Sequence, residues 1–209
     1  MNTRWIDENR DQIWQLTSHH AVLGIIPVVV SLVLSVPLGW WAHRSRTARR
    51  LLVPGASILY ALPSLPLFVL LPLILGTKIL DPINVIAALT LYGTDAFDSV
   101  GRSVRRDAVA MGYSNSQVFW RVALPLAVPA LTAGMRVVSA STLSLVSVGA
   151  LIGVPSLGYF FTDGYQRSFP TEIWIGIIGT LVLAIVFDLV IVAVGRLLTP
   201  WQRRKGEPA

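Results

Sequence analysis

Long apolar runs with few charges divide the chain. Two of these runs contain no Asp, Glu, Lys or Arg, and two others are interrupted by one charge each, Arg136 and Asp188. An α-helix needs about 20 predominantly apolar residues to cross a bilayer. The pattern therefore predicts an all-α membrane protein with about five transmembrane helices. The expected spans are residues 21–42, 51–75, 83–98, 126–152 and 173–194.

The second and third spans are irregular. Residues 51–75 include Pro54, Pro63, Pro66 and Pro72, so this helix is expected to be kinked and to face protein, which satisfies the freed carbonyls. The third apolar run is only about 12 residues long before Asp95, which is short for a span. Residues 1–20 mix tryptophans with charges and are expected to form an interfacial helix or a frayed polar terminus. Residues 199–209 are expected to form a tail.

Composition agrees with a membrane location. The chain has 209 residues, of which 54% are apolar and 13% are charged, whereas an ordinary globular domain has about 25% charged residues. The mean hydropathy is +0.64. The chain has no cysteine, which excludes a disulfide scaffold, a zinc site with cysteine ligands and a thiol nucleophile.

Basic residues indicate the orientation. With five spans, 12 of the 17 Lys and Arg residues fall on one side, 4 fall on the other and Arg136 lies within a span. The positive-inside rule then places the C-terminus in the cytoplasm and the N-terminus outside. The 12 residues are Arg44, Arg46, Arg49, Arg50, Arg102, Arg105, Arg106, Arg121, Arg196, Arg203, Arg204 and Lys205.

The sequence offers little for catalysis. It contains no G-x-x-x-x-G-K-[ST] phosphate-binding loop, and its 3 histidines lack the spacing of metal ligands. The serines between Ser139 and Ser147 lie in an apolar helix without a histidine partner, where small residues more often allow close helix packing. We therefore expect no catalytic residue, no metal and no cofactor bound by this chain.

Two charged residues lie inside expected spans. Because a charge in a membrane is costly, Arg136 and Asp188 should each face protein or water and have a partner. They could pair with each other. The sequence leaves two roles for such a pair: a structural ion pair that orients the helices, or a role in gating.

The longest polar segment between spans covers about residues 99–121. Val104, Ala108 and Met111 share a helical face, Gly112 interrupts the pattern, and a second short amphipathic run follows. The pattern predicts two short helices that meet at Gly112. Such a unit can dock on a soluble partner, or it can pack as a hairpin on its own bundle.

This segment resembles the cytoplasmic EAA loop of permease subunits in bacterial ABC importers. The family motif is E-A-A, three residues, Gly, nine residues, Ile, one residue and Leu-Pro. Arg106 and Asp107 stand here where the family has Glu and the first Ala, and Ala108 matches the second Ala. The match continues at Gly112 and, after nine intervening residues, at Val122, Leu124 and Pro125.

The resemblance extends over about residues 20–205 and is closest to permeases for the osmoprotectants glycine betaine, choline and carnitine. The family resemblance outside the loop rests on A-L-P-S-L near Pro63, on the glycines between residues 151 and 158 and on Thr199-Pro200, and the closer likeness to osmoprotectant permeases rests on segment 146–167. The family's third span is longer, by roughly eight to ten residues near Gly93 and Thr94. The resemblance implies a translocation path near Tyr60, Pro63, Ser64 and Tyr92, and an external loop with Gly153, Gly158, Tyr159 and Tyr165.

The resemblance also implies partners. These are cytoplasmic ATPase subunits that hold ATP and Mg, an extracytoplasmic substrate-binding protein, and a second permease subunit, identical or paralogous, in the bacterial cytoplasmic membrane. No nucleic acid is expected. A permease for amino acids or sulfonates is the alternative, and a secondary transporter that works alone is a more distant one.

Overall fold

The computed structural model describes residues 3–45, 47–48, 50–52, 54 and 102–201. These residues form helices and connecting turns and no strand. Three helices within them are long and apolar enough to cross a membrane. The expected spans 51–75 and 83–98 lie outside the described residues, except for the first few of the former, and so does most of the expected tail.

The first long helix begins earlier than the apolar pattern predicts. After α1 (Thr3–Glu8), helix α2 (Arg10–Arg44) continues without interruption through the expected span 21–42. Pro27 and Pro37 lie inside it. The expected boundary at residue 20 is therefore not a break in the structure, because no helix-breaking residue stands between Arg10 and Gly24.

One stripe of α2 is built from small residues. Gly24, Ser31, Ser35, Gly39 and Ala42 recur at helical spacing and are buried. Small side chains let helix backbones approach closely in membranes. A Cβ at Gly24 would lie 2.8 Å from Leu143 of the next long helix, so this stripe determines where α2 packs.

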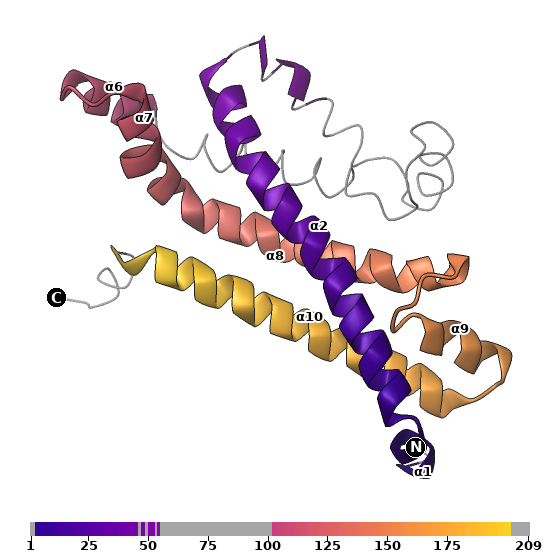
Figure 1. Ribbon diagram of the computed structural model, residues 1–209. Coiled ribbons are helices and arrows are strands. Elements are labelled where there is room, and N and C mark those ends of the chain that lie inside the picture. Colours follow the sequence, from indigo (N-terminus) through magenta and orange to yellow (C-terminus); the bar gives the residue numbers. More distant parts are fainter. Residues whose placement is uncertain (1–2, 46, 49, 53, 55–101, 202–209) are drawn as a thin grey trace.

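The other elements form the rest of the bundle (Figure 1). In chain order they are α6 (Arg102–Ala110), α7 (Asn115–Val118), the π-helix η1 (Phe119–Ala123), α8 (Leu124–Gly149), the 3-10 turn η2 (Ala150–Ile152), α9 (Tyr159–Gln166) and α10 (Pro170–Leu198). Figure 1 shows α8 and α10 side by side, with α9 joining them at one end and α2 crossing both. The expected span 126–152 falls on α8 and η2, and the expected span 173–194 falls on α10.

The bundle has two distinct ends. Helices α1 and α9 lie at one end, whereas α6, α7, the end of α2 and the end of α10 lie at the other (Figure 1). At the first end, Trp5 packs edge-on against Phe160, with ring centroids 6.2 Å apart. At the second end, the ring centroids of Trp40 and Phe119 are 4.9 Å apart. Aromatic contacts therefore join elements that are distant in the sequence at both ends.

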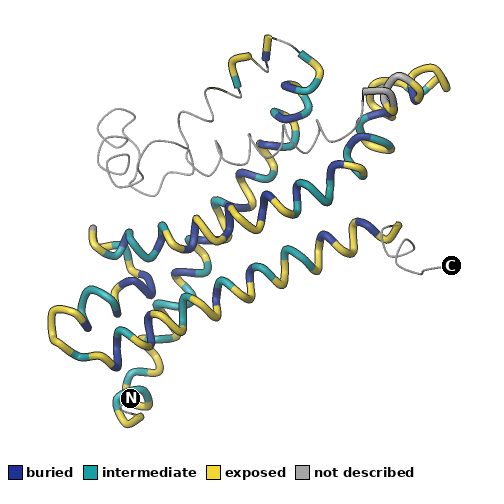
Figure 2. Tube along the Cα trace, turned by 180° about the vertical axis from the view of Figure 1, so that it is seen from behind, coloured by how far each residue is buried: buried dark blue, intermediate teal, exposed yellow. Residues whose placement is uncertain are grey.

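Helix α10 leaves much of its apolar surface uncovered. Leu181, Leu189 and Val190 are more than half exposed, and Figure 2 shows exposed positions along most of this helix. A soluble protein rarely leaves so large an apolar face open to water. The face fits hydrocarbon, as expected for a transmembrane helix.

Candidate functional site: the two ends of the bundle and the charged pair between them

Helix α6 ends in a Schellman turn at Gly112. The Gly112 N–H donates to the Val109 carbonyl at 3.0 Å, and the Tyr113 N–H donates to the Ala108 carbonyl at 3.1 Å. Gly112 has φ +87°. In this left-handed conformation the Cβ of any other residue would crowd the backbone, which is why glycine is favoured there. The two short helices thus meet at Gly112, as the pattern predicts.

Helix α7 begins with a capping box. The Ser114 hydroxyl accepts from the Gln117 N–H at 3.3 Å, and the Gln117 side chain accepts from the Ser114 N–H at 2.8 Å. These two bonds satisfy donors that a helix start leaves free. The chain then continues through η1 into α8, so the α6–α7 unit is directly connected to a membrane-spanning helix.

The residues expected for ATPase coupling occupy this unit and its junction with α8. Arg106 and Asp107 lie in α6, where Asp107 is exposed, and Ala108 is buried. Val122 lies in η1. Leu124 and Pro125 begin α8, which follows η1 without a break, and the Leu124 N–H still donates to the Phe119 carbonyl. Pro125 therefore lies within a continuous helical segment, where it removes one backbone N–H donor.

The opposite end contains the expected external loop. Gly153 has φ +85° and closes a second Schellman turn, in which the Val154 N–H donates to the Gly149 carbonyl at 3.1 Å. Gly158 lies so close to α8 that an added Cβ would be 1.9 Å from the Ser147 carbonyl oxygen. Tyr159 is 38% exposed and Tyr165 is 79% exposed, so both side chains form part of the surface at this end of the bundle.

His20 connects three elements at this end, a role that sequence reasoning missed. The side chain is fully buried. Its Nε2 lies 3.1 Å from the Leu143 carbonyl oxygen, and its Nδ1 accepts from the Leu157 N–H at 3.3 Å. Both nitrogens are satisfied if the ring is neutral with the proton on Nε2. His20 therefore holds the loop before α9 against α2 and α8.

A charged cluster also lies at this end. Arg167 contacts both Asp163 and Glu172, and the Glu172 side chain is 1% exposed. The hydrogen bond to Asp163 raises the pKa of the Arg167 guanidinium above its usual value. A buried carboxylate without a cation is strongly destabilising, so Arg167 fixes the turn between α9 and α10.

Arg136 and Asp188 form an ion pair between α8 and α10. Arg136 Nε donates to Asp188 Oδ1 at 2.5 Å, and its Nη2 donates to Oδ2 at 3.0 Å. The side chains are 51% and 38% exposed. The two charges that the sequence places inside spans are thus partners, in the two-point geometry that arginine favours with carboxylates.

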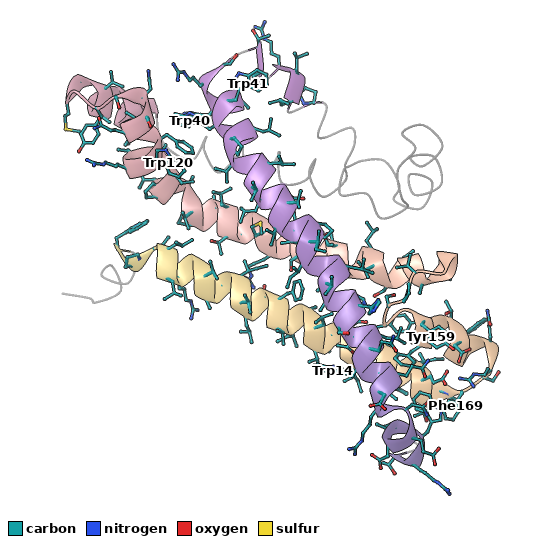
Figure 3. The ribbon with its side chains drawn as sticks, viewed as in Figure 1. Trp14, Trp40, Trp41, Trp120, Tyr159 and Phe169 are labelled. Carbon is teal, nitrogen blue, oxygen red and sulfur yellow. The ribbon has the colours of Figure 1, made fainter. Side chains whose placement is uncertain are left out.

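Other expected residues cannot be placed. Tyr60, Pro63, Ser64 and Tyr92, expected along the translocation path, lie outside the described residues. Within the described residues, no group of three His, Asp or Glu side chains is arranged to hold a metal ion. Figure 3 shows Trp40 and Trp120 at the α7 end of the bundle, and Tyr159 and Phe169 at the α9 end.

Known proteins share this fold over most of the chain. The permease fold of the methionine ABC transporter MetNI, in an inward facing conformation, matches with a TM-score of 0.75 and 16% identity. The match covers 92% of this chain and 98% of that one. At this identity the likeness concerns the fold. It confirms the expectation of an all-α membrane protein of the ABC importer permease type.

Several curated permeases have similar sequences. The glycine betaine/carnitine/choline transport system permease protein OpuCD of Bacillus subtilis is 25% identical, with 97% of this chain and 91% of that protein covered. ProW of Escherichia coli, a glycine betaine/proline betaine permease, is 28% identical over 88% of this chain. The ergothioneine transport permease/binding protein EgtU of Helicobacter pylori is 30% identical over 74% of this chain.

These relatives differ in length. The chain spans 28% of EgtU and 53% of ProW, whereas it spans nearly all of OpuCD. A family model described as "Binding-protein-dependent transport system inner membrane component" matches residues 32–204. This chain belongs to the family of binding-protein-dependent transport system inner membrane components.

Proposed function

We propose that the chain is the permease subunit of an ABC importer that moves a small quaternary ammonium osmoprotectant, such as glycine betaine, choline or carnitine, into the cytoplasm. The observation that carries the substrate class is the similarity to OpuCD over nearly the full length of both chains. ProW, named as a permease for glycine betaine and proline betaine, supports the same class of substrate.

Energy for transport comes from separate ATPase subunits in this proposal. The chain has no phosphate-binding loop, so ATP and Mg bind to the partner and the permease catalyses no reaction itself. The α6–α7 unit supplies the ATPase contact, because it protrudes at one end of the bundle and continues through η1 into α8. ATPase closure would then favour one arrangement of the spans over another.

The same reading assigns the two ends to the two sides of the membrane. The α6–α7 end and the C-terminus face the cytoplasm, because 12 of the 17 basic residues belong to that side when five spans are counted. The α1 and α9 end faces outward and receives substrate from a binding protein. A second permease subunit completes the path.

Uptake in cells tests the proposal. Labelled glycine betaine, choline and ergothioneine are supplied to cells with and without this gene, and in parallel to cells whose associated ATPase is inactivated. We expect uptake of glycine betaine or choline to be lost in both mutants. Loss of ergothioneine uptake alone would assign that substrate, which the similarity to EgtU makes the second candidate. Loss only without this gene would indicate a transporter that works alone.

A further inference from the structure

Two carboxylates and one guanidinium lie together in the turn between α9 and α10. Arg167 Nη2 contacts both Asp163 Oδ2 and Glu172 Oε1. Asp163 belongs to α9, Arg167 follows the last residue of that helix, and Glu172 lies in the first turn of α10. Because both carboxylates contact the same nitrogen atom, their oxygens lie close to each other. The cluster has one more negative than positive charge when all three groups are ionised.

The excess charge is buried. The Glu172 side chain is 1% exposed and the Asp163 side chain 20% exposed. Glu172 Oε2 is buried, and no group in the described part of the chain donates a hydrogen bond to it. An ionised carboxylate in such a place is costly unless it is paired and hydrogen-bonded. Arg167 can balance one of the two carboxylates, which leaves the other without compensation.

Neighbouring elements do not supply the missing positive charge. Asp163 and Arg167 are the ionisable groups that act on Glu172, and Tyr159 acts on Arg167. Residues 137–162, which cover the second half of α8 and the turn after it, contain no charged residue. In α1 and at the start of α2, the arginines have carboxylate partners of their own, and one further acid is exposed: the pairs are Arg4 with Glu8 and Arg10 with Asp7, and the acid is Asp11.

A proton fits this environment better than a metal ion does. The guanidinium already contacts both carboxylates, so a metal cation beside it would be repelled. A proton between the two carboxyl groups removes the excess charge and supplies a hydrogen-bond donor, as in other carboxylate pairs that share a site.

The electrostatics of Glu172, which precedes the expected span 173–194, agree with a shared proton. Burial raises the pKa of the Glu172 carboxyl, and a hydrogen bond with Asp163 raises this pKa further, whereas the charge of Arg167 lowers it. Because the two carboxyl groups interact, the titration belongs to the pair rather than to either residue.

We propose that Asp163 and Glu172 share one proton at neutral pH, and that this proton fixes the turn between α9 and α10. The position of the turn on the outer side of the membrane rests on the proposed function, whereas the shared proton does not. When the proton leaves, the buried cluster gains one negative charge. The connection between α9 and α10 is therefore weakened as the external pH rises.

Infrared difference spectra of the purified full-length chain in detergent, recorded between about pH 6 and about pH 9, test for the proton directly. A protonated carboxyl group has a carbonyl stretching band that an ionised carboxylate lacks. We expect the unmodified protein to lose such a band as the pH rises. Asp163→Asn and Glu172→Gln should each remove the band already at the lower pH, because the remaining carboxylate then pairs with Arg167 alone.

Asp7→Asn is the matched control. It removes an exposed carboxylate that pairs with Arg10 in α1 and α2, so the infrared band and its pH dependence should be retained.

Thermal unfolding provides a second readout. The folded chain holds a proton that an ordinary carboxyl group of the unfolded chain releases well below neutral pH, so stability decreases as the pH rises through the titration of the pair. We expect the unfolding midpoint to fall by about 3 °C or more between about pH 6 and about pH 9. Asp163→Asn should reduce this fall, and Asp7→Asn should not.

Two results would overturn the inference. One is the absence of a protonated carboxyl band from the unmodified protein at the lower pH, which would mean that both carboxylates are ionised; this result needs no variant to fold. The other is a band that survives in Asp163→Asn or in Glu172→Gln. Failure of the uptake experiment would refute the proposed function and leave the spectra and unfolding midpoints as they are.

Discussion

Ser168 adopts a backbone conformation that normally favours glycine. The described part of the chain has three Schellman turns, and their residues with positive φ are Gly112, Gly153 and Ser168. At Ser168, where φ is +52°, the Phe169 N–H donates to the Gly164 carbonyl at 2.8 Å. A left-handed residue other than glycine costs about 1–2 kcal/mol, so this turn is less stable than the other two.

Ser168→Gly should therefore stabilise the protein. The strain relieved in the folded state outweighs the extra conformational entropy that glycine gives the unfolded chain. We expect the free energy of unfolding to increase by about 0.5–1 kcal/mol. The measurement is the thermal unfolding midpoint of the purified protein in detergent. Gly153→Ser is the reciprocal control, since an added Cβ there meets no atom within 4 Å and only the backbone is strained. It should lower the midpoint, and a lower midpoint for Ser168→Gly would contradict the argument.

Single residues were predictable where the signal is local. Gly112 interrupts an amphipathic pattern, so its turn can be predicted from the sequence. His20 gives no such signal, because its two hydrogen-bond partners lie 123 and 137 residues away in the chain. The pairing of Arg136 with Asp188 could be predicted only in part. Because a charge in a membrane is costly, the sequence predicts that each residue has a partner. The structure shows which residues pair and with which hydrogen bonds.

At the scale of elements, the apolar pattern predicts spans better than helix boundaries. The expected span 173–194 falls on α10, and the expected span 126–152 falls on α8 and the turn η2. Helix α2, by contrast, begins eleven residues before the expected start of its span. Hydropathy indicates which part of a helix lies in lipid. The helix itself can extend beyond the lipid wherever its backbone hydrogen bonds are satisfied, so the two boundaries need not coincide. Here Trp5, Ile13 and Leu16 pack against the cluster around Phe160, which stabilises the polar first turns.

The turn between α6 and α7 gives a prediction about coupling. Gly112→Val places a β-branched residue at φ +87°, where such residues are genuine outliers. Because no atom lies within 4 Å of an added Cβ, the effect is on the backbone rather than on packing. We expect uptake to fall about tenfold, while the amount of protein in the membrane is unchanged. Uptake and ATP hydrolysis are measured together.

Gly112→Asn is the control for this variant. Asparagine adopts the left-handed conformation more readily than other side chains, so most of the uptake should remain. If valine and asparagine reduce uptake equally, the conformation of the turn is not what matters. If neither variant changes uptake, the α6–α7 unit does not carry the coupling.

At the scale of the whole molecule, the assignment of ends to membrane sides is open to a direct test. The chain has no cysteine, so single cysteines can be introduced without a background. Thr3→Cys and Gln166→Cys mark the α1 and α9 end, and Ser116→Cys marks the α7 end; all three positions are exposed.

A membrane-impermeant maleimide applied to intact cells should label Thr3→Cys and Gln166→Cys but not Ser116→Cys. Permeabilised cells, in which all three should react, provide the control for accessibility. Labelling of Ser116→Cys alone in intact cells would reverse the orientation. Labelling of both ends would mean that the three long helices do not separate them.

The ion pair between α8 and α10 has an electrical consequence for the whole molecule. Moving one elementary charge through a potential of 100 mV involves about 2.3 kcal/mol. Arg136 and Asp188 are held together by two hydrogen bonds, so a rearrangement that carries both helices together displaces no net charge. The intact pair would therefore add no net charge movement to such a rearrangement, whereas loss of either partner would leave one charge to move through the membrane field.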